Sequence, residues 1–286
     1  MHRLLIVDTS ALLHQSRFAL SAVEMTANGE DTAVIYAFLI KLKYILNAVW
    51  PQNVVFAIDS RTSLRKEIFP EYKARRREKT EKQLEFDQKT YPQFDIVINE
   101  VLPTIGYTNI FEQEGYEADD IIASICRDYY KKYEIVIASN DNDLYQLLRP
   151  NIVIYNIAKN SYFTYLNYKK KYEIPVKYWK RVKVYGGCSS DGVPGIRIPD
   201  STRNVGEKTA IKYLKGEIPE HYKVYKAFKH PMNKPIIKRN KKLVILPFKG
   251  VNSFDIKLTR LDRDGLVSVC KKYEFNSILR TIREWK

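Results

Sequence analysis

Aspartates follow three short, strongly apolar runs of this chain at the point where each run ends. Such β-branched runs, separated by stretches with helical spacing, are typical of buried parallel strands in an α/β sheet. Because such sheets bind ligands at the carboxyl ends of their strands, we expect the acids to converge on one edge. The runs and their acids are Leu4–Val7 with Asp8, Val54–Ile58 with Asp59, and Ile135–Ala138 with Asp141 and Asp143.

A fourth source of carboxylates is the group Glu117, Asp119 and Asp120, at the start of a predicted amphipathic helix. Acids gathered at one rim repel one another unless cations lie between them, and hard oxygen ligands favour Mg²⁺ or Mn²⁺. Taken singly, each acid is more simply a helix cap or a partner of a helix dipole. Capping does not explain why every predicted strand end carries an acid, so the pattern predicts a metal site.

The overall charge has the opposite sign. The chain has 48 Lys and Arg against 33 Asp and Glu, a net charge of +15. A basic body around an acidic site suits an enzyme that cleaves phosphodiesters, since cations hold the polyanion and carboxylates hold metals. The charge alone is equally compatible with a chromatin-type binder or a binder of anionic membranes.

The length of 286 residues, 45% of them hydrophobic, allows one large domain or a domain with a smaller module. Three widely spaced cysteines exclude a disulfide framework and a CxxC zinc site. We expect a soluble, cytoplasmic protein in a reducing compartment. Its longest apolar run, Ala33–Ile40, is too short to span a membrane, and Asp8 interrupts any signal peptide.

The periodicity predicts an order of elements along the chain. The segment 61–92 is dense in alternating charge, which by itself favours a solvated pair of surface helices. The loop-rich segment 186–206 leads into a glycine turn and a lysine at a helix start, which fits a phosphate clamp or an ordinary helix start. We expect helices at 10–20, 32–49, 93–105, 261–272 and 275–285, strands at 53–58 and 107–111, β structure over 151–164, and an amphipathic stretch ending at 185.

A series of motifs in this order resembles the structure-specific 5′-nuclease family, which includes flap endonucleases, the 5′-nuclease domains of bacterial DNA polymerase I, and phage 5′-exonucleases. Because no polymerase follows in this sequence, we expect the free-standing phage or bacterial type to be the closer match. The motifs are Ile6-Val7-Asp8, Ala57-Ile58-Asp59, Phe69-Pro70-Glu71-Tyr72-Lys73-Ala74-Arg75-Arg76, Gly115-Tyr116-Glu117-Ala118-Asp119-Asp120, Ser139-Asn140-Asp141-Asn142-Asp143-Leu144, Ser190-Asp191-Gly192-Val193-Pro194-Gly195-Ile196, Val205-Gly206-Glu207-Lys208-Thr209-Ala210 and Lys272-Tyr273-Glu274-Phe275-Asn276-Ser277-Ile278-Leu279.

The resemblance implies an α/β fold with a central, mostly parallel sheet flanked by helices. It implies a nuclease core over 1–165 that carries a helical arch at about 61–92. It also implies a helical region over 166–286 with a helix-three-turn-helix at about 186–215 that grips duplex DNA. This replaces the interpretation of 61–92 as a merely solvated surface.

The resemblance also implies a role for each site residue. Lys73 and Arg76 would face the scissile phosphate, and the ring of Tyr72 would stack on a terminal base. Two Mg²⁺ ions, replaceable by Mn²⁺, would serve a two-metal hydrolysis, and a K⁺ ion would sit in the hairpin module. The first metal would be held by Asp8, Asp59, Glu117 and Asp119, and the second by Asp119, Asp141, Asp143 and Asp191. Asp120 would also belong to the metal-binding residues, and DNA would be bound by Arg75, Gly195, Val205, Gly206, Lys208 and Thr209.

Two features depart from the family pattern. Cys188 stands where the family has an aspartate, and a thiol is a poor ligand for Mg²⁺, so the second metal should bind more weakly. Alternatively, Cys188 is a small residue packed under the loop. The stretch Arg197–Asn204 is longer than usual, which affects the expected duplex contact.

The function that follows is a Mg²⁺-dependent 5′ to 3′ exonuclease and flap endonuclease. Its substrates would be branched or 5′-ended duplex DNA, flaps and RNA:DNA hybrids, in replication, primer removal or repair, with replication proteins as partners and no membrane association. One alternative is a PIN-like ribonuclease, although such domains are about half this length and lack an arch and a hairpin module. The other is a basic, non-catalytic DNA-binding accessory protein.

Overall fold

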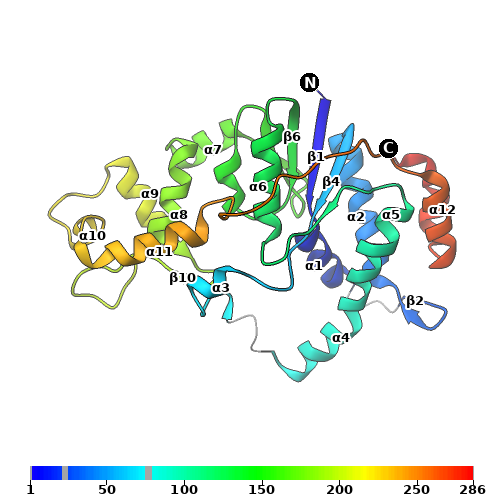
Figure 1. The fold of residues 1–286 in the computed structure, drawn as a ribbon, viewed down its shortest axis with the longest axis horizontal. Helices are drawn as coiled ribbons and strands as arrows, with labels where there is room; N and C mark the ends of the chain where they lie inside the picture. Colours follow the sequence, from blue (N-terminus) through cyan, green and yellow to red (C-terminus); the bar gives the residue numbers. More distant parts are fainter. Residues whose placement is uncertain (1, 21–24, 75–78, 286) are drawn as a thin grey trace.

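A six-stranded sheet lies at the centre of the computed structural model, which describes residues 2–20, 25–74 and 79–285. The strand order is β5-β4-β1-β6-β7-β8, and all neighbours are parallel except β7 and β8 (Figure 1). This confirms the predicted α/β class. The strands are β1 (His2–Asp8), β4 (Asn53–Ala57), β5 (Ile110–Phe111), β6 (Tyr133–Ala138), β7 (Ile152–Asn156) and β8 (Ser161–Phe163).

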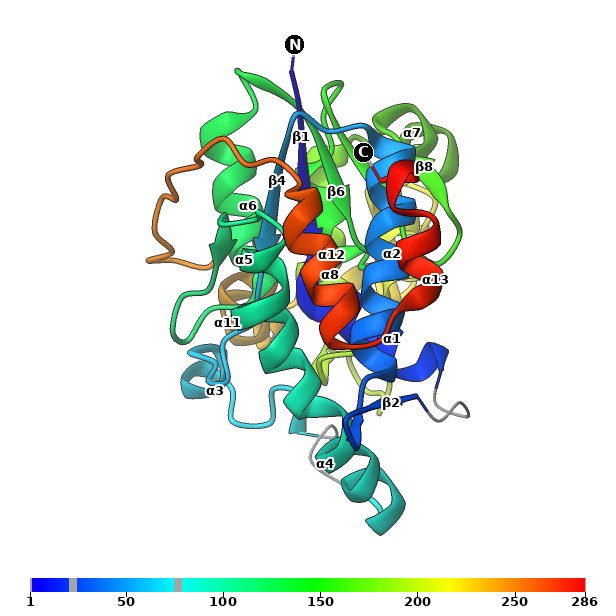
Figure 2. The ribbon, with the colours of Figure 1, turned by 90° about the vertical axis from the view of Figure 1, so that its right-hand side faces the viewer.

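Alternation along β1 sends its side chains into two separate cores. Leu5 and Val7 pack against α1 (Thr9–Ala19), α2 (Ala33–Val49) and the C-terminal helices, which cover one face of the sheet (Figure 2). Leu4 and Ile6 face α6 and the helices that follow it on the other side. These helices are α6 (Ala118–Tyr129), α7 (Tyr165–Tyr172), α8 (Trp179–Gly186), α9 (Glu207–Lys215), α10 (Lys223–Ala227) and α11 (Lys234–Val244), and the C-terminal ones are α12 (Arg263–Lys272) and α13 (Asn276–Arg280).

Helices α8 to α11 form a lobe that extends away from the sheet (Figure 1). A two-stranded hairpin of β9 (Gly187–Cys188) and β10 (Val193–Pro194) follows α8. The segment 245–262 then runs back from this lobe to α12. It is fixed to the sheet by Asn53 and Asn109, whose side-chain amides both donate to the Lys257 carbonyl.

The charge-dense segment continues into the next predicted helix without a break. α3 (Arg65–Ile68) is short, and α4 (Glu81–Ile96) runs on through a π-helical turn (Val97–Val101) into α5 (Leu102–Thr104). The expected boundary at Pro92 is therefore wrong. Next to this proline, the Gln93 side chain accepts from the Val34 N–H and donates to Asp31, which ties α4 to the start of α2.

Two further expectations need correction. The strand expected at 107–111 shrinks to Ile110–Phe111, and the side chain of the preceding Asn109 holds the segment 245–262. The last helix ends at Arg280 and is followed by a short 3₁₀ turn, Ile282–Glu284. Among the described residues, no helix has the length and apolar character needed to cross a membrane.

Candidate active site

The carboxyl ends of β1 and β4 bring two of the predicted acids together. Asp8 ends β1, and its carboxylate accepts from the Ala11 N–H at 3.0 Å and from the Ser139 hydroxyl at 2.8 Å. Asp59 follows β4, and its Oδ1 accepts from the Ala118 N–H at 2.7 Å. The two acids thus also fix the beginnings of α1 and α6, so capping and site formation occur together.

The acids after β6 belong to the same edge. Ser139 receives the Asp141 N–H at 3.1 Å, and the Asp143 N–H donates to Asp141 Oδ1 at 2.7 Å, which folds the turn back toward the sheet. Asp119 lies in the first turn of α6. This geometry agrees with the expectation that the acids after the strands and at the start of α6 lie at one edge of the sheet.

These carboxylates disturb one another's ionisation. Burial and the neighbouring charge of Asp59 raise the pKa of Asp8 to about 7. Loss of solvation, followed by the charges of Asp141 and Asp8, raises the pKa of Asp119 well above its ordinary value. Loss of solvation and Asp143 raise the pKa of Asp141 to about 6. Negative charge is therefore concentrated here beyond what the protein compensates, and the oxygen-only donor set fits a hard divalent cation.

Glu117 is compensated, in contrast to these aspartates. The Lys73 ammonium lies 2.8 Å from its Oε1, and the Tyr72 hydroxyl donates to its Oε2 at 3.0 Å. Burial alone would raise the pKa of Glu117, but Lys73 and Arg65 lower it below the ordinary value. Lys73 also hydrogen-bonds through its N–H to the Asp191 carbonyl, so this part of the expected arch lies against the acids.

The structure corrects the expected role of Tyr72. Its side chain is only 2% exposed and packs with Val184, Cys188 and Leu243. A ring buried in this way cannot offer a face to a terminal base. Arg75 and Arg76 lie outside the described residues.

Asp120 also differs from expectation. Both of its oxygens are bound by the Arg65 guanidinium, at 2.6 and 2.9 Å, and Oδ1 additionally accepts from the Phe248 N–H. Both side chains are buried, and Arg65 packs over the Phe248 ring. Asp120 is thus a structural counter-ion beneath the site and has no free oxygen for a metal.

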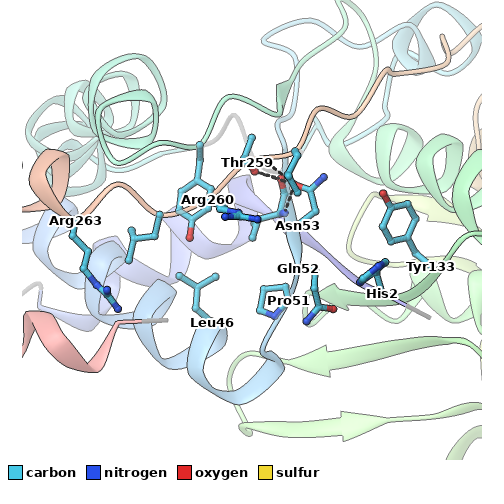
Figure 3. A pocket seen from close by; sticks show the side chains of 13 residues that line it. His2, Leu46, Pro51, Gln52, Asn53, Tyr133, Thr259, Arg260 and Arg263 are labelled. Carbon is cyan, nitrogen blue, oxygen red and sulfur yellow. Dashed lines mark hydrogen bonds between the residues drawn. The ribbon is translucent and has the colours of Figure 1, made fainter.

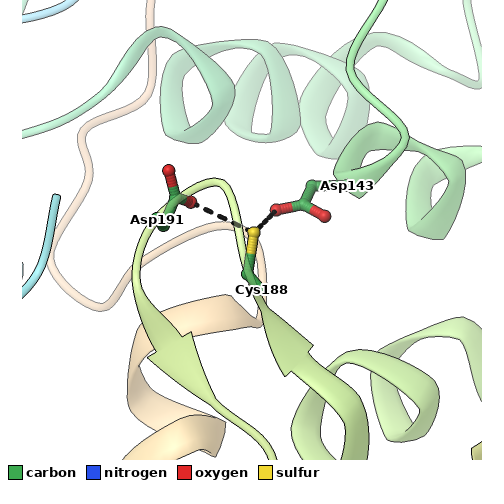
Figure 4. Close-up of side chains that lie close together, drawn as sticks. All are labelled: Asp143, Cys188 and Asp191. Carbon is green, nitrogen blue, oxygen red and sulfur yellow. Dashed lines mark hydrogen bonds between the residues drawn. The ribbon is translucent and has the colours of Figure 1, made fainter. Parts of the chain in front are cut away.

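Cys188 lies between Asp143 and Asp191 in the β9–β10 hairpin (Figure 4). Its Sγ is 3.5 Å from Asp143 Oδ2 and 3.4 Å from Asp191 Oδ2. Burial and both neighbouring carboxylates raise the pKa of this thiol above its ordinary value, so it stays protonated. A second partner of Asp143, which no local sequence signal predicts, is the buried Lys183 of α8, whose ammonium lies 2.5 Å from Oδ1.

A cavity of about 880 Å³ opens beside Asp59, between α1 and α4. Its walls include the aromatic rings of His14, Tyr91 and Phe94 together with Arg61. Another cavity, of about 550 Å³, lies at the opposite edge of the sheet, where His2, Asn53 and Tyr133 begin or border strands (Figure 3). The first cavity borders Asp59, whereas the second lies at the amino ends of the strands, away from the acids.

The residues expected to contact DNA fall into two groups. Gly206 and Lys208 are exposed and Thr209 is half-buried at the start of α9. Val205 is buried, and its N–H is bound to the Ile196 carbonyl. Gly195 is also buried, and a Cβ there would meet the Val205 carbonyl oxygen at 2.0 Å. Val205 and Gly195 are therefore buried parts of the turn, with no exposed side chain to offer to DNA.

Comparison with known proteins gives one consistent result. Residues 3–173 match the family described as 5′-3′ exonuclease, N-terminal resolvase-like domain. The chain is 30% identical over 292 residues to a 5′-3′ exonuclease of Aquifex aeolicus, with 99% of this chain and 96% of that protein covered. It is 30% identical over 215 residues to the thermostable DNA polymerase I of Thermus thermophilus, with 74% of this chain and 24% of the polymerase covered.

The fold is similar to that of the bacteriophage T5 flap endonuclease solved as a pseudo-enzyme-product complex with DNA and metal ions. The TM-score is 0.71 at 17% identity, with 99% of this chain and 98% of that chain covered. The phage structure supports the fold, and the two sequence matches carry the family assignment. This chain therefore belongs to the 5′-3′ exonuclease family and is a nuclease, a phosphodiester hydrolase.

Proposed function

We propose that this nuclease is a Mg²⁺-dependent 5′ to 3′ exonuclease and flap endonuclease. Its substrates would be branched or 5′-ended duplex DNA and RNA:DNA hybrids, in replication, primer removal or repair. The observation that carries the proposal is the set of acids Asp8, Asp59 and Asp141 after the strands and Asp119 at the start of α6. Burial and the neighbouring negative charges raise the pKa values of Asp8, Asp119 and Asp141. The phage relative's complex with DNA and metal ions supports it.

The proposed cation ligands divide into two sets. Asp8, Asp59 and Asp119 with Glu117 would hold the first divalent cation, and Asp119, Asp141, Asp143 and Asp191 the second. When bound, such cations lower the pKa of a water and stabilise charge on the leaving oxygen. Mn²⁺ should replace Mg²⁺ because both accept oxygen ligands.

The residues of the chain itself would orient and neutralise the substrate. Lys73, 2.8 Å from Glu117, would exchange part of this ion pair for the scissile phosphate. Arg65 would keep Glu117 in place through its own contact of 3.7 Å and through Asp120. The cavity beside Asp59 would admit the strand that carries the 5′ end.

We also propose that α8, the turn 187–206 and α9 form the helix-three-turn-helix. Helices α8 and α9 pack on one another across the turn, and the exposed N-terminus of α9 carries Gly206 and Lys208. Backbone N–H groups at a helix N-terminus favour phosphate. The division into a nuclease core (1–165) and a helical region (166–286), the K⁺ ion and the replication partners remain predictions.

The first test is cleavage of a 5′-labelled flap substrate in Mg²⁺ and in EDTA, with product length separating flap cutting from stepwise degradation. Asp59→Asn and Asp141→Asn should lose most activity, by about 10³-fold or more, with unchanged or tighter DNA binding, since removing negative charge cannot weaken attraction to phosphate. Asp255→Asn, at an exposed position of the segment 245–262, is the matched control. Wild-type turnover by Asp59→Asn in Mg²⁺ would contradict the metal-ligand assignment, and a wild-type protein that binds flaps without cutting them would favour the accessory-protein alternative.

A further inference from the structure

Lys183 is a nearly fully buried lysine in the middle of α8, with its side chain 2% exposed. Its ammonium lies 2.5 Å from Asp143 Oδ1 and donates to Asn142 Oδ1 at 2.7 Å and to the Glu207 carboxylate. A buried charge is costly unless it is paired and hydrogen-bonded, and this ammonium is paired with Asp143 and Glu207 and hydrogen-bonded to Asn142 and Glu207. Burial alone would lower the pKa of Lys183, but Asp143 and Glu207 raise it, so the side chain stays charged.

This lysine changes the charge around Asp143 and Asp191, which were proposed above for the second cation and are called the Asp143 half of the site. Asp143 is engaged at both oxygens, by Lys183 at Oδ1 and by the Cys188 thiol at Oδ2. Asp191 shares the same thiol and also lies 3.8 Å from the Lys73 ammonium. The acids of this half thus already have lysine partners, and the Cys188 thiol lies between them (Figure 4).

The acids proposed for the first cation, called the Asp8 half of the site, have fewer positive partners. Of these acids, Glu117 is paired with Lys73 and Arg65. Asp8, Asp59 and Asp119, in contrast, form no ion pair with a lysine or arginine of the described residues within 4.0 Å. Their contacts are backbone N–H groups and hydroxyls, such as Ala118 to Asp59 and Ser139 to Asp8. Uncompensated charge of this kind attracts a divalent cation more strongly than a carboxylate that already has a lysine.

We propose that Lys183 is a built-in counter-ion of Asp143, so that the protein without DNA holds one divalent cation, at the Asp8 half. The cluster Asp143, Cys188 and Asp191 takes its cation only together with a substrate phosphate, which adds the negative charge and oxygen ligands that this half lacks. The inference rests on the proposed metal-dependent nuclease function. It makes Lys183 a positioning residue, tied through Glu207 to the start of α9 and hence to the proposed duplex-binding module.

The test is titration of the full chain with Mn²⁺ alone at pH 7.5 without DNA, followed by the electron paramagnetic resonance signal of free Mn²⁺. Wild type should bind one Mn²⁺, with any second at least about tenfold weaker. Lys183→Met should tighten the second Mn²⁺ by about tenfold or more, because Asp143 loses its neutralising charge. Lys180→Met, on the same helix and with the same change in charge, should behave as wild type.

Two equally tight Mn²⁺ ions in the wild type would overturn the proposal, as would a Lys183→Met protein that titrates like wild type. If Lys183→Met does not fold, Lys183→Gln can replace it, because it keeps a hydrogen-bond donor for the buried acids. This variant should show the same tighter binding of the second Mn²⁺, and unchanged binding would overturn the proposal. Because Mn²⁺ binding is measured without DNA, failure of this proposal can be told apart from failure of the proposed function. If the protein cuts no flap DNA in any divalent metal, the proposed function is wrong, whatever the Mn²⁺ stoichiometry.

Discussion

The acids at the strand ends make the stability of the metal-free protein depend on pH, and their pKa shifts give the direction of this dependence. Asp8 and Asp141 have folded-state pKa values of about 7 and about 6, above the ordinary range of an aspartate. Between pH 4 and 7 the folded protein therefore holds protons that the unfolded chain has released. The unfolding free energy must fall as the pH rises through this window.

Asp8→Asn isolates this contribution. In EDTA at pH 8 the variant should melt roughly 3 °C or more above wild type, because it removes a buried, repelled charge. The amide can still accept from Ala11, and its second group can donate to Ser139. At pH 5, where Asp8 is already protonated, the advantage should shrink, and added Mn²⁺ should stabilise wild type but not the variant.

Thermal melts at both pH values, with and without Mn²⁺, check this expectation. Asp255→Asn controls for the loss of a carboxylate at an exposed position. An Asp8→Asn protein that is less stable than wild type at pH 8 would mean that capping of α1 outweighs the repulsion.

At the scale of elements, the expected arch is anchored at both of its described ends. Lys73 is held among the acids at one end, and at the other the Asp87 carboxylate of α4 binds both Arg17 and Lys79. The Arg17 guanidinium also lies 4.6 Å from the centre of the Tyr91 ring. The segment is therefore attached to the core on both sides of residues 75–78.

Lys73→Ala tests the proposed role of this element. The single-turnover rate at saturating protein should fall by roughly 10²-fold, as expected for loss of an electrostatic contact to the reacting phosphate. The Mg²⁺ concentration for half-maximal rate should also fall, because Glu117 loses its neutralising partner. Lys82→Ala, an exposed lysine of α4, should change neither quantity. An unchanged rate for Lys73→Ala would assign this lysine to Glu117 alone.

The sequence predicted the strand ends and their acids because each signal is local, an apolar run followed by a carboxylate. It could not predict Arg65 with Asp120 or Lys183 with Asp143, since these partners are 55 and 40 residues apart and meet only through the packing of α3 and α8. The prediction of an exposed Tyr72 ring was wrong for the same reason, because its contacts come from residues far away in the sequence. The charge pattern of the surrounding segment is that of a surface, yet Phe69 and Tyr72 pack into a small core with Val184 and Leu243.

At the scale of the whole molecule, the net charge of +15 and the acidic site serve different steps. On the proposed function, the basic body would attract the polyanion, and the acids would repel it from their edge until cations are bound. Affinity for duplex DNA should therefore fall steeply with salt, while the affinity of the Asp8 half for Mn²⁺ should fall less, because partly buried charges are screened less than exposed ones.

Gly206→Val tests where the duplex lies on this body. Gly206 is exposed at the beginning of α9, and a Cβ there meets no atom within 4 Å, so the fold has room for the larger side chain. The variant should retain the wild-type melting temperature and Mn²⁺ binding but lose duplex affinity by about tenfold, because its isopropyl group keeps the phosphate away from the helix N-terminus. Gly206→Ala should lose less, which separates steric blocking from a change in the backbone. The measurement is fluorescence anisotropy with a labelled duplex at two salt concentrations, and equal affinities for both variants and wild type would place the duplex elsewhere than on the start of α9.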